Sequence, residues 1–429
     1  MKRFAVVINA EVTNPLSTKP HIQTSSYPSW RIIIATFLTM VVVYGIWYSY
    51  SVFLVAFVRE FGWSRSLVAG AFSVFILIHG SLGPPIGWLA RRFGPRRLFL
   101  AGAVVIAIGL ALTAEARAWW HLYLAFSGLT AIGISLAGWV PAVVLIHGWF
   151  PNRFATAMGI ASAGIGAGIF ALNPLAQFVI DSWDWRWAFR MEALLTVGWL
   201  LPATRWLMRD PLDPTTRAGD PSGRAPGAAW TLATAARTWR FWGVAGVYFT
   251  GNFATQMLMV HQVAYLVDHG VPTMVAATVG GAVGLVSIGG KVGWGAFSDR
   301  AGREPACTLA FGCVTASIGM LVLAGRYPAS LLPFAYAALI GLGYAVLSPV
   351  FPAVAGDLFA GPGFSTIYGT LYAVICLGLA AGAWSAGKIF DLTASYAAAL
   401  WIALAMAALT PALLWAVAPR YGNPPPAGR

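Results

Sequence analysis

A few ionisable side chains stand inside long apolar runs of this sequence, and they are the first candidates for chemistry. Lys291 lies within the apolar run 274–297, and Ser287 precedes it by one helical turn on the same helix face. His79 and His261 lie in two other apolar runs. A charge in such a run is costly unless it faces a cavity or a partner, or snorkels to water along its stem. A lone histidine either carries a proton or makes a structural hydrogen bond between helices.

The apolar runs that hold these residues are long enough to cross a membrane. The 429-residue sequence is 59% hydrophobic and only 10% charged, whereas soluble domains carry about 25% charged residues. A helix crosses the hydrocarbon core with about 20 apolar residues, and the runs do not alternate as barrel strands do. We therefore predict an all-α membrane protein with twelve transmembrane helices, at 31–58, 67–90, 98–115, 120–148, 154–180, 187–208, 240–267, 274–297, 306–325, 330–358, 364–390 and 395–418.

The longest polar interruption divides the predicted helices into two sets of six. It spans 209–239 and is rich in proline and charged residues, which is typical of a linker. The first residues lack the apolar core of a cleavable signal peptide. In chain order we expect an N-terminal tail, a six-helix bundle, a linker, a second six-helix bundle and a C-terminal tail, at 1–30, 31–208, 209–239, 240–418 and 419–429.

The basic residues indicate the orientation. Of the 27 Lys and Arg residues, 19 lie on the side of the termini, 6 on the opposite side and 2 inside predicted helices. This excess predicts that both termini and the linker are cytoplasmic, in a multi-pass protein of the cytoplasmic (inner) membrane surrounded by lipid. The basic residues lie in short loops and not on one face, so we expect no nucleic-acid partner. The three cysteines lie in apolar runs, and we expect neither a disulfide nor a metal site.

The two halves of the sequence resemble each other. A shift of 210 residues aligns Gly159 with Gly369 and Asp181 with Asp391. Two parallel six-helix halves predict a transporter with its site between them. A shift of 208 residues sets Ser287 against His79, so His79 is expected to face the site unless it only bonds a neighbouring helix. The same shift of 208 aligns Gly62 with Gly270, Gly87 with Gly295, Arg92 with Arg300, Gly94 with Gly302, Gly133 with Gly341 and Pro141 with Pro349.

One stretch of each half resembles a known loop signature. The sequence Gly295-Ala296-Phe297-Ser298-Asp299-Arg300-Ala301-Gly302-Arg303 resembles the cytoplasmic loop signature of the major facilitator superfamily. A glycine there permits close helix packing, and the aspartate can bond a helix end or an arginine. The first-half copy includes Gly87, Arg91, Arg92 and Gly94. Arg91 stands where the family has aspartate, which puts the usual charge relay of the first half in doubt.

Within this superfamily, three stretches are similar to the monocarboxylate and oxalate/formate transporters. They are Ser-Val-Phe-Leu-Val-Ala-Phe leading into Glu-Phe-Gly-Trp-Ser at 51–64, Trp-Phe-Pro-Asn-Arg and Ala-Met-Gly-Ile-Ala at 149–161, and Trp-Arg-Trp-Ala-Phe at 185–189. In this group an arginine on the eighth helix holds the substrate carboxylate, and Lys291 occupies that position here. A lysine would bind a carboxylate as a point charge, without the fork of arginine.

The resemblance adds candidates around Lys291. Ser287 stands where relatives keep an acidic or amide residue, so a proton carrier is missing there. Tyr50 stands where some relatives place a lysine, with aromatic packing as its alternative role. The repeat sets His261 against Phe53, near Tyr50, so we expect His261 to line the site as well. Ile375 stands where dicarboxylate-handling relatives carry a second cation, which favours a singly charged substrate. Three further hydroxyls are candidates for the lining of the site, those of Tyr344 and Ser348 on the tenth helix and Tyr372 on the eleventh.

The remaining charged residues in the predicted helices are expected at the interfaces. Glu192 follows Arg190 near the start of the sixth helix, which favours an interfacial ion pair. Lys388 and Asp391 lie near the end of the eleventh helix, spaced to pair or to snorkel.

These features predict a secondary transporter of a small organic monoanion that works by alternating access around Lys291. We expect a monomer that takes up its anion together with protons, with His79 or His261 as the proton carrier; anion exchange would need no such carrier. Efflux of larger amphipathic or aromatic compounds and sensing without transport are the alternatives. The sequence carries no GxSxG, HExxH or phosphate-binding loop, so we expect neither an enzyme nor a cofactor.

Overall fold

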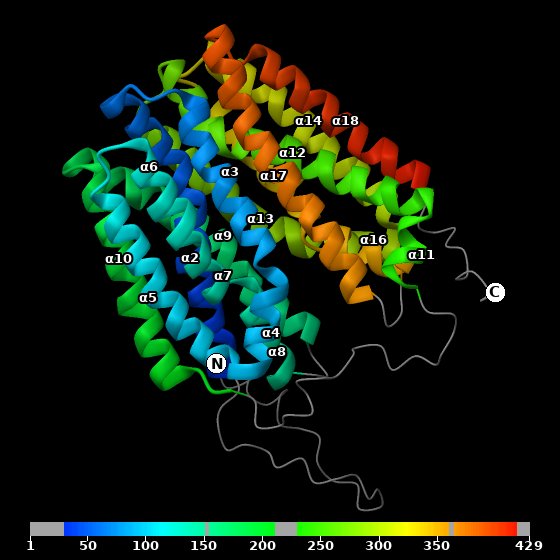
Figure 1. Cartoon of the computed structure of the whole chain (residues 1–429). Helices are drawn as coiled ribbons and strands as arrows, with labels where there is room; N and C mark the ends of the chain where they lie inside the picture. The colour runs from blue at the N-terminus through cyan, green and yellow to red at the C-terminus, as the bar shows by residue number, and fades with distance from the viewer. Residues whose placement is uncertain (1–29, 151–153, 211–229, 360–363, 418–429) are drawn as a thin grey trace, which may run out of the picture.

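All regular structure in the described part of the chain is helical. The computed structural model describes residues 30–150, 154–210, 230–359 and 364–417. Figure 1 shows the two halves as neighbouring groups of long helices. The first half consists of α2 (Trp30–Phe61), α3 (Arg65–Ser81), α4 (Gly83–Phe93), α5 (Pro95–Ala114), α6 (Trp119–Leu122), η1 (Tyr123–Thr130), α7 (Ala131–Ala137), α8 (Trp139–Trp149), α9 (Phe154–Ser182), α10 (Trp185–Pro202) and η3 (Ala203–Leu207).

The second half follows the same plan after a short helix that precedes it. Its elements are α11 (Leu232–Ala236), α12 (Trp239–Asp268), α13 (Thr273–Ala301), α14 (Arg303–Arg326), α15 (Leu332–Tyr344), η5 (Ala345–Leu347), α16 (Val350–Phe359), α17 (Phe364–Thr393) and α18 (Ala397–Val417). We call the membrane face at Trp30 and Val417 the terminus side and the other face the far side.

Each of the twelve predicted spans corresponds to a helix or to consecutive helices. By length and apolar character, nine spans in the described residues can cross a membrane, or ten if the bent pair α3–α4 is one span. The other two, α10 with η3 and α12, are less apolar. Arg186, Arg190 and Glu192 lie at the start of α10, and α12 buries Asn252 and Gln256. Side chains of this kind are tolerated in a span when they face protein. The predicted all-α fold is confirmed.

Breaks in the helices occur where the sequence supplies proline or glycine. α3 and α4 meet at an angle of 46°. Gly83, Pro84 and Pro85 open α4, and proline has no amide hydrogen to continue the hydrogen bonds of α3. Gly138 separates α7 from α8 in the fourth span. The sequence had predicted each of these spans as unbroken, because hydropathy does not register a change of helix direction.

Four glycines show that the two halves share backbone geometry. The positive-φ glycines of the described residues are Gly62 (64°), Gly270 (89°), Gly94 (84°) and Gly302 (100°). They form two pairs related by the 208-residue shift, and each lies at a turn between helices. Because this φ range is open to glycine and strained for other residues, the sequence repeat reflects a repeated chain path.

Equivalent helix crossings support the same conclusion. A side chain at Gly168 on α9 would overlap the carbonyl oxygen of Val41 on α2. A side chain at Gly378 on α17 would come 2.6 Å from the carbonyl oxygen of Phe249 on α12. The 208- and 210-residue shifts relate these two contacts. In both halves, the first and fifth spans therefore approach each other through a glycine, as is common between membrane helices.

The halves are joined from the far side to mid-depth. α3 packs against α17, and α9 packs against α13. On the far side Asp391 accepts hydrogen bonds from the backbone amides of Arg65 (2.9 Å) and Ser66 (2.8 Å). Deeper in the interface, Ser73 Oγ donates to the carbonyl oxygen of Ala380 at 2.8 Å.

Toward the terminus side the halves separate. α4, α8 and α16 make their main contacts within their own halves. The blue α3–α4 and the orange α17 diverge in this direction in Figure 1. No neighbouring atom lies within 4 Å of the side-chain positions of Gly159, Gly289 and Gly369. The last close backbone contact between α9 and α13 joins Gly166 to Gly284, so the closed part of the interface ends near Ser287.

Candidate functional site

Lys291 lies one helical turn beyond the last contact between the halves. On the same face of α13, Ser287 is fully buried and its Oγ donates to the carbonyl oxygen of Gly284 at 2.7 Å. The hydroxyl of Tyr344 on α15 donates to Ser287 Oγ at 3.2 Å. Lys291 Nζ lies 5.8 Å from the centroid of the Tyr344 ring. The structure thus brings together three of the predicted residues at the depth where the interface opens.

Lys291 is a half-buried cation without an ion-pair partner in the described part of the chain. Among the described residues, none of the ion pairs involves its ammonium group. An ammonium group inside the membrane is stabilised by a neighbouring anion or by water, and a ring face supplies a part of that stabilisation. An anion that binds beside Lys291 would supply the rest.

Tyr344, the neighbour of Lys291, belongs to a group of tyrosines from both halves. Tyr44 and Tyr48 lie on α2, and Tyr368 and Tyr372 lie on α17. Tyr48 is within electrostatic range of Tyr344 and Tyr44, and Tyr372 is within range of Tyr44, Tyr48 and Tyr368. We call Tyr44, Tyr48, Tyr344, Tyr368 and Tyr372 the tyrosine cluster. Phenolic hydroxyls are hydrogen-bond donors of the kind that bind an anion.

The sequence pointed to Tyr372 and Tyr344 but missed Tyr44 and Tyr48. These two residues are four positions apart and share one face of α2, a spacing that was visible in the sequence. Tyr50 has another environment: its hydroxyl donates to the carbonyl oxygen of Val68 at 2.7 Å, and its ring stacks on Phe72 and Phe126. Tyr50 therefore has the packing role that was its alternative.

The other α15–α17 candidates differ in position. Ser348 is exposed at the end of η5, and none of the hydrogen bonds given for the described residues involves its side chain. Ile375 is partly buried on α17 and packs against the core. Position 375 therefore adds no second cation to Lys291.

His79 makes a hydrogen bond inside the first half. Its Nδ1 lies 3.0 Å from the Oγ of Ser135 on α7. Its ring meets that of Trp47 edge to face at 5.0 Å, and Trp47 also neighbours Tyr48 at 6.3 Å. His79 is thus one aromatic ring away from the tyrosine cluster and has the structural bond that was its alternative role.

His261 belongs to a group on the far side and not to the Lys291 site. Its Nδ1 lies 3.0 Å from the hydroxyl of Tyr396, and its Nε2 lies 2.9 Å from the carbonyl oxygen of Ala383. Both ring nitrogens are therefore used in hydrogen bonds that tie α12 to α17 and to the start of α18.

Arg65 at the start of α3 connects the halves on the far side. Its guanidinium pairs with Asp268 at 2.7 Å, donates to the hydroxyl of Tyr396 at 2.6 Å and lies 3.9 Å from the centroid of the Phe390 ring. The Asp391 carboxylate accepts the hydrogen bonds of the two backbone amides described above. We call Arg65, Asp268, Asp391 and Tyr396 the far-side latch. The expected pairing or snorkelling of Asp391 is wrong, because its carboxylate caps α3.

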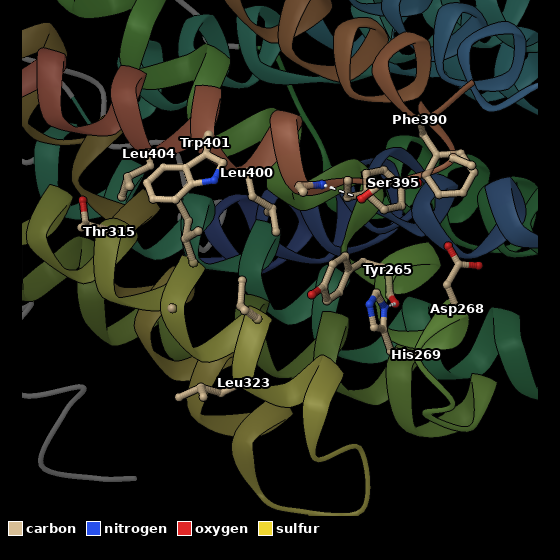
Figure 2. A pocket seen from close by; sticks show the side chains of 16 residues that line it. Tyr265, Asp268, His269, Thr315, Leu323, Phe390, Ser395, Leu400, Trp401 and Leu404 are labelled. Carbon is tan, nitrogen blue, oxygen red and sulfur yellow. Dashed lines mark hydrogen bonds between the residues drawn. The ribbon is translucent and has the colours of Figure 1, made fainter. Parts of the chain in front are cut away.

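A cavity of about 870 Å³ lies beside the latch. Figure 2 shows Asp268 and His269 at its polar end and Leu400, Trp401 and Leu404 along α18. Trp401 is 70% exposed at this cavity. The cavity is separate from Lys291, and none of the predicted site residues lines it.

The loop signature of the second half forms an ion-pair group. Arg303 bonds Asp299 at 2.7 Å, Asp357 at 3.0 Å and the Ser298 hydroxyl at 2.8 Å. All of these partners belong to the second half. Gly302 supplies the turn before α14, and Gly295 packs against Pro349, while Arg300 is exposed.

In the first half, an acidic residue from outside the loop signature contacts this segment. Asp210 accepts a hydrogen bond from the Arg96 amide at 3.0 Å, and its carboxyl lies directly against Gly94. Arg92 stacks over Trp88, and Gly87 packs against Val140. The side chain of Arg91 lies outside the described part of the structure.

Glu192 does not form the interfacial ion pair expected from the sequence. Arg190 pairs instead with Glu115 at 2.6 Å. Glu192 is fully buried, and the Ser49 hydroxyl lies 2.8 Å from its Oε1. The expectation is wrong because α10 turns this residue toward α2 and not toward the membrane surface.

Comparison with known proteins agrees with this fold. Residues 36–336 match the model of the Major Facilitator Superfamily. The chain is 30% identical to Monocarboxylate transporter 13 of Bos taurus over 382 residues, which cover 87% of this chain and 85% of that protein. It is 28% identical to Monocarboxylate transporter 3 of Rattus norvegicus, over 86% of this chain and 75% of that protein. With its all-helical fold and its membrane-spanning helices, this chain belongs to the major facilitator superfamily and is a multi-pass membrane transporter, not an enzyme.

Proposed function

We propose that this protein carries a small organic monoanion of the monocarboxylate type across the cytoplasmic membrane. The observation that carries the proposal is Lys291, a half-buried cation without an ion-pair partner in the described residues, at the depth where the two halves separate. The similarity to proteins named monocarboxylate transporters supports the same class of substrate.

The site would hold the anion through charge and hydroxyl groups together. Lys291 would attract the carboxylate, and the hydroxyls of Tyr372 from the second half and Tyr48 from the first half would donate to it. The Tyr344 hydroxyl would have to turn away from Ser287 to join them. A ligand bound by both halves favours a state in which they approach each other around it. Since a ligand shifts an equilibrium only through its differential contacts with two states, these contacts would drive closure of the terminus side.

A single cation favours a singly charged substrate. One ammonium group neutralises one carboxylate, and a second carboxylate in the same cavity would remain uncompensated. Ile375 provides no charge for it. Lys291 also lacks the rigid guanidinium fork of an arginine. The site should therefore select less strictly for the shape of the substrate around its carboxylate.

The orientation and the coupling complete the proposal. The excess of basic residues on the terminus side supports a cytoplasmic location for both termini, so the described state is open to the cytoplasm. Uptake of one negative charge against the membrane potential costs about 2.3 kcal/mol per 100 mV. A symported proton cancels that charge, and we therefore propose proton symport by a monomer.

The test is uptake of radiolabelled monocarboxylates such as lactate, pyruvate and acetate by purified protein in proteoliposomes. Lys291→Ala should reduce the rate about tenfold or more, because loss of a charged hydrogen-bond partner costs about 1.5–3 kcal/mol and 1.4 kcal/mol is a factor of ten. Lys291→Arg should retain transport and narrow the range of accepted anions.

Lys388→Ala is the matched control, since Lys388 is an exposed lysine of α17 far from the tyrosine cluster in sequence. It should transport as the wild type does. Full activity of Lys291→Ala would contradict the site, and preferential uptake of dicarboxylates would contradict the selection for monoanions.

A further inference from the structure

Glu192 is a buried carboxyl group that the proposed site leaves without a role. It lies on α10, is 0% exposed, and its Oε2 has no hydrogen-bond partner in the described part of the chain. Its Oε1 lies 2.8 Å from Ser49 Oγ on α2. Intramembrane carboxyl groups are costly and are kept where a function needs them.

No cation stands opposite this carboxyl group among the described residues. α10 packs against α2, α5, α9 and η3. Arg186 is paired with Glu60 and Arg190 with Glu115, both at the far side, and Asp181 is held by Gln177. The titratable or charged groups on these elements are Arg31, Tyr44, Tyr48, Tyr50, Arg59 and Glu60 on α2, Arg96 and Arg97 on α5, Asp181 on α9, Arg186 and Arg190 on α10, and Arg205 on η3.

The hydrogen bonds around Ser49 indicate where a proton resides. Ser49 Oγ lies 2.8 Å from Glu192 Oε1 and 2.9 Å from the carbonyl oxygen of Ile46. The hydroxyl has one hydrogen, and sharing it between the two oxygens would weaken both bonds. Both contacts are hydrogen bonds if the carboxyl group of Glu192 donates to Ser49 Oγ and Ser49 donates to Ile46. A buried carboxyl without a cation also favours this neutral form.

The helix that holds Ser49 also reaches the anion site. Tyr48, the preceding residue on α2, belongs to the tyrosine cluster with Tyr344. Any movement of α2 that follows anion binding therefore changes the surroundings of Glu192. His79 and His261 are less suited to carry the proton, because their rings are engaged in bonds within one half.

We propose that Glu192 binds the coupling proton in the state open to the terminus side, and gives it up when α2 moves and water reaches the carboxyl group. This role rests on the proposed proton-coupled transport of a monoanion. Ser49 positions the carboxyl group and accepts its proton in a hydrogen bond, and Tyr48 links the pair to the bound anion.

The decisive variant is Glu192→Gln, because an amide resembles the neutral carboxyl group in shape. In proteoliposomes, exchange of internal for labelled external lactate should stay within about twofold of wild type, since the neutral form is the one used in this state. Accumulation driven by a proton gradient, and substrate-induced entry of protons measured with an internal pH dye, should be lost. Proton entry equal to that of wild type would overturn the proposal.

Two further measurements keep the test decisive if Glu192→Gln fails to fold. Glu192→Asp should shift the pH of half-maximal accumulation, while Glu115→Gln should not; Arg190 bonds the exposed Glu115 and lowers its carboxyl pKa, so it is already ionised. An unshifted profile for Glu192→Asp overturns the proposal.

The second measurement does not depend on the substrate. Wild-type protein at neutral pH should show the infrared band of a protonated carboxylic acid. The Glu192→Asp variant should lack a band at that frequency. Absence of the band from wild type overturns the role of Glu192 whatever the transported anion is. Absence of lactate exchange by wild type, with that band present, contradicts the proposed substrate and leaves the protonation of Glu192 supported.

Discussion

Two tyrosines of α2 that are two residues apart have different surroundings. Tyr48 is partly exposed and belongs to the tyrosine cluster, whereas Tyr50 is 1% exposed among aromatic rings. Residues two apart on a helix point to different sides, so a role assigned to one does not transfer to the other. Tyr44 and Tyr48 share one side of α2, and Tyr48 has Tyr344 of the second half among its neighbours.

At the residue scale we predict that Tyr48→Phe affects substrate affinity and that Tyr50→Phe affects stability. Tyr48→Phe should raise the substrate concentration for half-maximal uptake several-fold, since it removes a hydroxyl worth about 1 kcal/mol to the bound anion. Tyr50→Phe should leave uptake unchanged and lower the thermal stability in detergent, because Val68 loses its hydrogen bond. Uptake by Tyr48→Phe at wild-type affinity would show that the Tyr48 hydroxyl does not bind the anion.

The sequence could identify residues whose roles depend on type and spacing alone. Lys291 is an example of such a prediction, since a cation in an apolar run and a family position suffice to select it as a candidate. Glu192 was not predictable, because its burial depends on the rotation of α10 against α2. His79 and His261 were left between two roles, and their hydrogen-bond partners on α7 and α17 become visible only in three dimensions.

At the element scale, helix crossings through glycine hold each half together. α2 meets α9 at Gly168, and α12 meets α17 at Gly378. Hydropathy predicted the spans and the 208-residue shift predicted their equivalence. Hydropathy could not predict the breaks at Leu82 and Gly138, because an apolar run looks the same in a straight and in a bent span.

We predict that Gly168→Val destabilises the first half. The added side chain would overlap the backbone of Val41, and overpacking costs about 1–3 kcal/mol. The expected result is a lower melting temperature of the detergent-purified protein and a lower yield of monodisperse protein. Gly198→Val on α10 is the control, since no neighbouring atom lies within 4 Å of that position. Equal melting temperatures for the two variants would show that the helix crossing at Gly168 accommodates a larger side chain without loss of stability.

At the scale of the whole molecule, closure on one side accompanies opening on the other. The far-side latch joins α3 to the ends of α12 and α17 through Arg65 and Asp391. No comparable group joins the halves among the described residues of the terminus side, where the ion pairs of Arg303 stay within the second half. The latch therefore favours the described state, and an opposite state has to break it.

Asp391→Asn should shift the molecule toward the state open on the far side. The amide replaces a charged acceptor of two backbone N–H groups by a weaker one, and at this exposed position the loss is about 1 kcal/mol, a several-fold change in population. Cys376 is a natural reporter, because it is 3% exposed and lies against Gly80 in the interface between α17 and α3. In a Cys307→Ser, Cys313→Ser background, a membrane-impermeant maleimide added from the far side should label Cys376 several-fold faster in Asp391→Asn. Asp181→Asn is the matched control, since Asp181 is the repeat equivalent of Asp391 and bonds Gln177 of its own helix. Equal labelling rates in Asp391→Asn and Asp181→Asn would mean that the latch does not hold the halves together, and that the packing of α3 on α17 alone keeps the far side closed.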